Sequence, residues 1–209
     1  MLLGNASSQL KRTESNQLRA ELAVSHTIQY EDLARWKAAE ISRLFDTQIK
    51  VEVYQNKARF SVTKGKRIRV ISKWFYRNGR KAVTDKIRFM NHPVGISMLL
   101  CDAGSIRKRK KRHTDGTLYY SAPCIIIAMR DFSYDDIERF LIHIKKSCGA
   151  EGDTEKKGAY QNVIFNAENS KKLWHYVSCR IPEVPSVLEK FSFIIERYGI
   201  NQSDETAGT

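Results

Sequence analysis

The sequence predicts an α+β fold in which one unit of helices and hairpins is used twice. Residues 29–36 recur as residues 133–140, 104 positions later, and in each copy a tyrosine and two acids come first. In both copies apolar residues then follow at the three- and four-residue spacing of an amphipathic helix. Segments before and after each helix have the alternation or the β-branched composition that is typical of strands. These observations indicate two similar halves built from helices and antiparallel hairpins.

In the first half, residues 18–25 alternate between apolar and polar side chains and predict a half-buried strand. A second hairpin is expected over residues 51–54 and 58–62, followed by a helix over residues 66–77. The helix between the two hairpins carries an apolar stripe made by Leu33, Trp36, Ile41, Leu44 and Phe45.

The second half repeats this order. Strands are expected at residues 123–129 and 160–165, and further helices at residues 167–177 and 185–198. The helix between the strands has its apolar stripe at Ile137, Phe140, Leu141 and Ile144. A longer turn at residues 109–117 accounts for the unequal spacing of the two halves, and residues 201–209 form a polar tail.

Each half begins with an apolar run that ends in a small polar cluster and passes into a basic, strand-like segment. These runs lie at residues 1–8 and 92–106. The second run has Pro93 near its start and Asp102-Ala103-Gly104-Ser105 near its end. This pattern resembles the LAGLIDADG homing endonucleases in their monomeric form with two pseudo-repeats, and the resemblance covers almost the entire chain.

The resemblance implies two pseudo-symmetric αββαββα repeats whose antiparallel sheets form a saddle over the bound nucleic acid. On this basis residues 1–80 form the first repeat, 81–91 a linker, 92–200 the second repeat with a C-terminal helix, and 201–209 a tail. Two packed helices that cross a domain need more residues than precede Asn5, so we expect the first helix to be truncated or to begin before Met1.

The chain is strongly basic. Its 36 lysines and arginines outnumber 23 acids, and the net charge of +13 favours a polyanionic partner, most often nucleic acid. No apolar stretch is long enough to predict a membrane span. The four cysteines lack metal-binding spacing, which favours an intracellular, reducing location, with a mitochondrion or chloroplast as the suspected compartment.

In the family that the chain resembles, an acid at the end of each repeat's first helix holds a divalent metal. Asn5 and Ala103 stand at these two places. Mg²⁺ prefers carboxylate oxygens, so the amide of Asn5 is a poor substitute and the methyl group of Ala103 is none. We therefore expect no catalytic acid to be intact and no cofactor to be needed, with Mg²⁺ required only if nuclease activity survives.

Asp102 is the remaining candidate at this corner, but neighbouring residues on a helix point about 100° apart. Three roles are open: a hydrogen-bonding residue at the helix end, a weak metal ligand, or half of an intact nuclease site. The first is favoured.

The candidate nucleic-acid-binding residues are basic and lie in or beside the expected hairpins. The densest basic run lies at residues 107–113. In a strand, Arg107, Arg109 and Lys111 would share one face, from which they can reach a groove of the nucleic acid. Lys81 and Lys190 match the basic residues that the family keeps near the scissile phosphates. The remaining candidates are Lys11, Arg12, Arg19, Arg59, Lys64, Lys66, Lys108, Lys110 and Arg112.

The sequence therefore predicts a nucleic-acid-binding protein derived from a homing endonuclease that does not cleave its partner. It would act as an RNA-binding maturase or as a structural component of an RNA–protein particle such as an organellar ribosome. RNA and double-stranded DNA are both open as partners, and a protein or particle is expected to cover the truncated first helix. The alternatives are an active site-specific endonuclease that cuts double-stranded DNA and a purely protein-binding scaffold.

Overall fold

The computed structural model describes residues 6–12, 18–63, 65–77, 80–158 and 160–200. Asn5 and the expected truncated helix lie outside these residues, as do Lys64 and the predicted tail. No helix of the described part has both the length and the apolar character that a bilayer crossing requires.

Two four-stranded antiparallel sheets have the same spatial order. The first sheet runs β1-β2-β4-β3 and the second runs β7-β10-β12-β11, so the strands of each half pair in the order first, second, fourth, third. This repetition in space confirms the two-fold repeat that the sequence predicts. The strands of these sheets are β1 (Ala6–Arg12), β2 (Leu18–Thr27), β3 (Glu52–Tyr54), β4 (Lys57–Val62), β7 (Gly104–Arg107), β10 (Cys124–Ala128), β11 (Asp153–Lys157) and β12 (Tyr160–Ile164).

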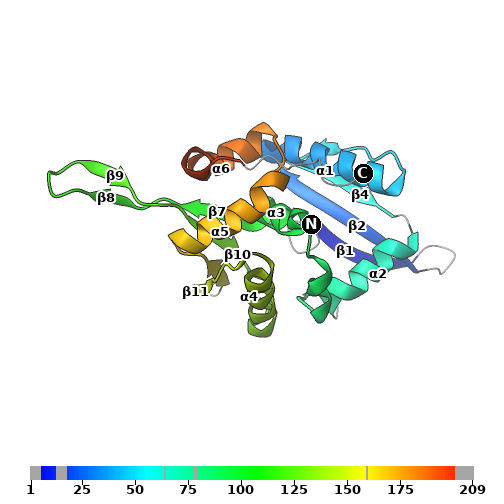
Figure 1. Ribbon diagram of the computed structural model, residues 1–209. Coiled ribbons are helices and arrows are strands. Elements are labelled where there is room, and N and C mark those ends of the chain that lie inside the picture. The colour runs from blue at the N-terminus through cyan, green and yellow to red at the C-terminus, as the bar shows by residue number, and fades with distance from the viewer. Residues whose placement is uncertain (1–5, 13–17, 64, 78–79, 159, 201–209) are drawn as a thin grey trace, which may run out of the picture.

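Six α-helices accompany the described sheets, and Figure 1 shows α3 between the two sheets. They are α1 (Glu31–Phe45), α2 (Gly65–Phe75), α3 (Pro93–Ala103), α4 (Tyr134–Cys148), α5 (Ala167–Val177) and α6 (Pro185–Tyr198). A two-stranded ribbon of β5 (Tyr76–Arg77) and β6 (Arg80–Lys81) and a short helix, η2 (Asp85–Phe89), connect α2 to α3.

One face of each sheet is covered by helices and the other is open. In the first sheet Leu22, Val24 and Phe60 are buried against Ala38 and Ile41 of α1. The opposite face carries small or charged side chains of intermediate or full exposure, because successive residues of a strand point to opposite sides. These side chains are Ser7, Ala23, Ser25, Arg59 and Ser61.

The second sheet belongs to the larger core. Ile125, Ile127 and Val163 are fully buried there, together with Trp174 and Phe191 from α5 and α6. Leu33, Phe75, Val83 and Ile87, which precede α3 in the chain, pack into the same core. The centre of the molecule is therefore shared between residues of both halves.

The predicted turn at residues 109–117 is wrong over Lys110–Arg112. These residues form β8, which pairs with β9 (Leu118–Tyr120), and the two strands extend as a narrow arm beyond the second sheet (Figure 1). We call β8, β9 and the residues between them the arm. Tyrosines on β9 have high strand propensity, and their pairing with β8 continues a ribbon past Arg109, so that Lys111 lies in a strand as its charge run had suggested.

Candidate nucleic-acid interface and the corner at the end of helix α3

The end of α3 holds a buried ion pair where the family resemblance implies a metal ligand. Ala103 is the last residue of α3, and the Asp102 carboxylate before it is fully buried. The Lys37 ammonium from α1, also buried, donates a short hydrogen bond to Asp102 Oδ1. His26 at the end of β2 completes the group, with Nε2 3.2 Å from Lys37 Nζ and 3.7 Å from Asp102 Oδ1.

Electrostatics favour a neutral histidine beside this ion pair. Burial alone would raise the pKa of Asp102, but the charge and hydrogen bond of Lys37 hold this pKa below its usual value. Burial lowers the pKa of His26 to about 4, and the positive charge of Lys37 adds to that effect. Asp102 is thus an anion whose counter-charge is already supplied from within the protein.

The described residues at this corner do not fit a divalent cation. Ala103 has no side-chain oxygen, and the Asp102 carboxylate faces an ammonium group inside the protein. Elsewhere in the described part of the chain, no three His, Cys, Asp or Glu side chains come together as metal ligands would. Of the three roles open for Asp102, the structure favours the hydrogen-bonding and ion-pairing one.

Sequence reasoning missed Lys37, although a signal was present. Lys37 lies on the same helical face as Leu33, Ala34 and Ile41, which are buried apolar residues. A lysine at an apolar position is almost never fully buried unless it is paired. Its presence there could have indicated a buried anion.

Lys81 and Lys190 both approach this corner. Lys190 Nζ donates to the Cys101 carbonyl oxygen at 2.7 Å, so this lysine holds the end of α3. The pKa of Lys190 and the pKa of Lys81 are both lowered by burial, and the negative charge of Asp102 opposes this shift only in part. The charge of Asp102 thus acts on a lysine from α6 and on a lysine from β6.

Equivalent aspartates at the starts of α1 and α4 hold the segments that carry these lysines. Asp32 accepts hydrogen bonds from the backbone nitrogen and hydroxyl of Ser186, at 2.8 and 2.5 Å, one turn before Lys190. Asp136 accepts from the Val83 backbone nitrogen at 2.8 Å, two residues after Lys81. These are the second acids of the repeated tyrosine–acid–acid pattern, so the repeat in sequence has a structural purpose.

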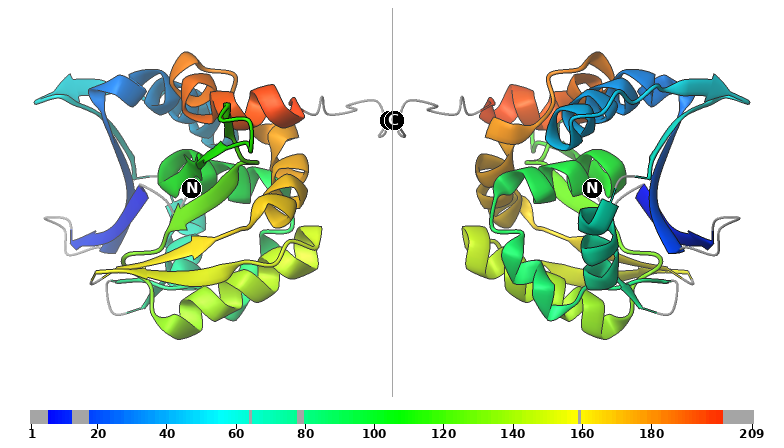
Figure 2. Two further views of the ribbon diagram at one scale, coloured as in Figure 1. Left: turned by 90° about the vertical axis from the view of Figure 1, so that its left-hand side faces the viewer. Right: turned by 90° about the vertical axis from the view of Figure 1, so that its right-hand side faces the viewer.

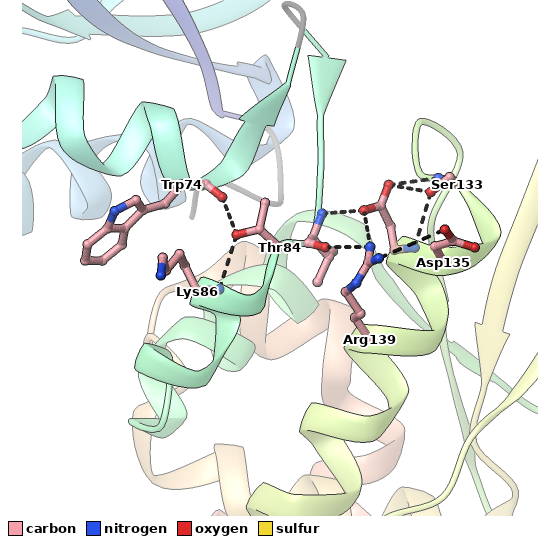
Figure 3. A network of polar contacts seen from close by, with 8 residues as sticks. Trp74, Thr84, Lys86, Ser133, Asp135 and Arg139 are labelled. Atoms are coloured by element: carbon pink, nitrogen blue, oxygen red, sulfur yellow. Dashed lines mark hydrogen bonds and ion pairs between the residues drawn. The ribbon is translucent and has the colours of Figure 1, made fainter.

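Around Asp136 the contacts form a network that joins α4 to the β6–η2 connection (Figure 3). Ser133 donates to Asp136 from its backbone nitrogen and its hydroxyl, and the Asp136 nitrogen donates back to the Ser133 hydroxyl, which makes a capping box. Arg139 reaches the Val83 carbonyl oxygen at 3.4 Å, and the Thr84 hydroxyl donates to the Trp74 carbonyl oxygen. The β6–η2 connection is thus held by α4 through Asp136 and Arg139, and by α2 through the Trp74 carbonyl oxygen.

A cleft of about 800 Å³ lies beside this network. It extends from Ser7 of β1 to the loop between β10 and α4 and is lined by both charges, with five cations against three acids. The cations are Arg77, Arg80, Lys81, Arg130 and Arg139, and the acids are Asp131, Asp135 and Asp136. Of these cations only Lys81 was predicted; Arg77 and Arg80 lie in the β5–β6 ribbon, Arg130 in a loop and Arg139 in α4.

A smaller hollow of about 360 Å³ lies on the open face of the second sheet. Arg130 and Tyr160 contribute to it, with the guanidinium carbon 5.2 Å from the centre of the tyrosine ring. The other lining residues are Ser105, Arg107, Ile126, Ala128 and Asn162.

The remaining predicted basic residues are distributed over both sheets. Arg107 is paired with Glu155 of β11 through two hydrogen bonds of 3.0 and 2.5 Å, so its charge is largely neutralised. Lys108 Nζ lies 4.8 Å from the centre of the Phe193 ring in α6. Arg59, Lys66, Arg109, Lys110, Lys111 and Arg112 are exposed, and the backbones of Lys11, Arg12 and Arg19 lie in the β1–β2 hairpin, where Lys11 is opposite Arg19.

Comparison with known proteins identifies the fold. Among solved structures, I-WcaI bound to its DNA recognition sequence is 12% identical, with a TM-score of 0.65 over 90% of this chain and 80% of that chain. Mesophilic variants of I-DmoI give a TM-score of 0.59 at 10% identity, over 85% of this chain and 90% of theirs. The LAGLIDADG meganuclease I-AabMI bound to uncleaved DNA gives 0.55 at 9% identity, over 95% and 90%.

The search of curated proteins finds no significant match. The family model of the LAGLIDADG DNA endonucleases matches residues 1–173, most of the chain. Together with the paired sheets and the repeated helix starts, this match shows that the chain belongs to the LAGLIDADG DNA endonuclease family.

Proposed function

We propose that this protein binds nucleic acid through the open faces of its two sheets and the cleft between them, and does not cleave it. The observation that carries the proposal is the state of the α3 corner. Ala103 occupies the place of one catalytic acid, and the neighbouring Asp102 carboxylate is sealed by Lys37. The basic residues of the cleft remain beside it.

Phosphodiester hydrolysis by this family needs metal ions that activate water and stabilise the leaving oxygen. Binding without cleavage requires only cations that contact the phosphates and an open surface that fits a groove or a loop of the nucleic acid. The chain retains the cations and the open sheet faces that binding requires, and it lacks a metal-binding carboxylate at residue 103. Structural relatives bound to DNA, such as I-WcaI and I-AabMI, support nucleic acid as the partner.

The test combines binding with cleavage. Labelled duplex DNA and structured RNA should bind at low salt, and a plasmid library that contains candidate target sites should stay uncut with Mg²⁺ or Mn²⁺. Specific double-strand cleavage would instead establish the alternative, an active homing endonuclease. Failure of both probes to bind at low salt would favour a protein-binding scaffold.

A binding protein without cleavage is suited to two roles, an RNA-binding maturase or a structural component of an RNA–protein particle such as an organellar ribosome. We place the protein in an organelle on this proposal. Purification from its host with and without nuclease treatment tests it, because an RNA-dependent set of co-purifying proteins is expected. A set that is unchanged by nuclease would contradict the particle role.

A further inference from the structure

Exposed aromatic rings accompany the basic residues of the second half. Tyr119 and Tyr120 of the arm are 38% and 52% exposed, and Tyr160 at the small hollow is 52% exposed. On the arm, cationic β8 pairs with aromatic β9, so that Lys111 lies opposite Tyr119 and Lys110 opposite Tyr120. Such rings contribute little to a core, and their exposure needs another explanation.

One face of the arm is fixed to the body of the protein. The Tyr120 ring meets the Phe193 ring of α6 edge-on at 5.8 Å, and Lys108 Nζ lies 4.8 Å from the centre of the same ring. These contacts hold the base of the arm against α6. The arm is therefore positioned before any ligand binds.

The other face carries rings and cations in alternation. The His113 ring stacks on Tyr119, with centres 4.1 Å apart, on the side where Lys111 lies. Pairing continues toward the sheet, since the Ser121 nitrogen donates to the Arg109 carbonyl oxygen at 2.9 Å. Arg109 thus connects the arm to β7, whose last residue, Arg107, lines the small hollow with Tyr160. We call the hollow and the outer face of the arm, which are joined through Arg107 and Arg109, the aromatic track.

The chemistry of the aromatic track suits base faces rather than base edges. In a duplex, neighbouring bases cover each other's faces, and the grooves expose only the edges. Unpaired nucleotides offer their faces to tyrosine, histidine and arginine, as in proteins that bind single strands or RNA loops. Residues 107–112 are all cationic and Asp115 is the single acid between residues 107 and 117, so the charge favours a polyanion over a protein surface.

Building on the proposed function, we infer that the aromatic track binds unpaired nucleotides, with Tyr119 and Tyr160 stacking on bases. Asn162 and Arg130 lie beside Tyr160 in the hollow and provide hydrogen-bonding groups for the edge of a base placed there. Lys111 and Arg109 lie along the path of the phosphates. The source of the unpaired nucleotides is either RNA or single-stranded DNA.

The test measures fluorescence anisotropy with four labelled probes of about 12 nucleotides: single-stranded RNA, single-stranded DNA and the blunt duplex of each. Tyr119→Ala and Tyr160→Ala should each weaken single-strand binding about tenfold and leave duplex binding within about twofold. Tyr119→Phe and Tyr160→Phe keep the ring and should bind as the parent does. Tyr134→Ala removes a tyrosine at the start of α4 that is more exposed than either of them, and it should change nothing.

The outcomes separate this inference from the proposed function. Tighter binding of RNA than of DNA single strands would identify RNA as the source, and equal binding would support unpaired bases of either sugar. Binding that prefers the duplexes, or that is unchanged in both alanine variants, would overturn the aromatic track while leaving nucleic-acid binding intact. Failure of all four probes at low salt would overturn the proposed function as well.

Discussion

Lys37 and Asp102 determine what chemistry the centre of this protein can offer. Taking two charges out of water costs several kcal/mol for each ion, and their attraction repays this only when the geometry is good. Here the two groups come from α1 and α3 and lie in direct contact, with His26 as a neutral neighbour. The ammonium group of Lys37 thus supplies the positive charge that balances the Asp102 carboxylate.

Lys37→Met should lower the free energy of unfolding by about 3–5 kcal/mol, because it leaves the Asp102 carboxylate buried without a counter-charge. The double variant Lys37→Met/Asp102→Leu should recover most of this loss. Urea denaturation measures both. Lys172→Met, which removes an exposed lysine paired with Glu168 on α5, is the control and should cost at most about 1 kcal/mol. Equal effects of Lys37→Met and Lys172→Met would contradict a buried pair.

His26 should make the protein less stable in mild acid. Its pKa is about 4 in the folded protein against 6.5 for a free histidine, so the unfolded chain takes up the proton first. Stability is therefore complete above pH 6.5 and falls by about 3 kcal/mol as the pH drops toward 4. Asp102, whose pKa is also depressed, adds a further loss only at lower pH.

Urea midpoints measured at intervals between pH 7 and pH 4.5 test this dependence. His26→Gln removes the titrating group, so its midpoint should vary much less over this range. A parent protein whose midpoint is constant from pH 7 to pH 4.5 would show that His26 titrates normally.

At the scale of elements, α1 and α4 use the same device in their first turns. Asp32 and Asp136 each accept a backbone N–H from a distant segment, 154 and 53 residues away in the chain. The start of α1 therefore holds the segment that carries Lys190, and the start of α4 holds the segment that carries Lys81. The rigid placement of Lys190 and Lys81 depends on these two carboxylates.

Asp136→Asn should destabilise the protein by about 1–3 kcal/mol. Both carboxylate oxygens of Asp136 accept hydrogen bonds, Oδ1 from Val83 and Oδ2 from Ser133, and an amide would turn its NH₂ group toward one of these donors. Asp135→Asn is the matched control, since Asp135 is mostly exposed and its carboxylate lies 4.0 Å from the Arg139 guanidinium. Thermal denaturation should separate the two variants clearly, and equal midpoints would argue against the anchoring role.

At the scale of the whole molecule, the excess of positive charge and the position of the cleft govern affinity. Each phosphate that meets a cation releases a counter-ion, so affinity should fall steeply as salt rises. The cleft and the small hollow share Arg130, which places this residue where both surfaces meet.

Arg130→Gln should reduce the slope of log affinity against log salt concentration by about 1. Titrations of labelled single-stranded RNA and duplex DNA at a series of salt concentrations measure the slope. Arg43→Gln removes another exposed arginine, from α1, where it pairs with Glu40, and should leave the slope unchanged. If both variants shift the slope equally, affinity depends on net charge and not on the cleft.

Local pattern in the sequence was sufficient for the elements and their repetition. The residues that open α1 and α4 have the same spacing of acids and apolar side chains, and helix starts depend on interactions within a few residues. The corner at the end of α3 was also visible, because the absence of an acid at Ala103 can be recognised without a structure. The turn expected from Arg109 begins later than predicted, because pairing with β9 decides the conformation of Lys110–Arg112.

The sequence by itself determined the two-fold arrangement and the basic character, since these follow from residue type and local spacing, while the absence of an acid at Ala103 was implied by the resemblance to the family. The tertiary structure alone decided that Lys37 neutralises Asp102, that Glu155 neutralises Arg107 and that Asp32 holds Ser186. The paired residues are 65, 48 and 154 positions apart. The free energy of a charge depends on what lies within a few ångströms of it, and only the folded chain fixes those neighbours.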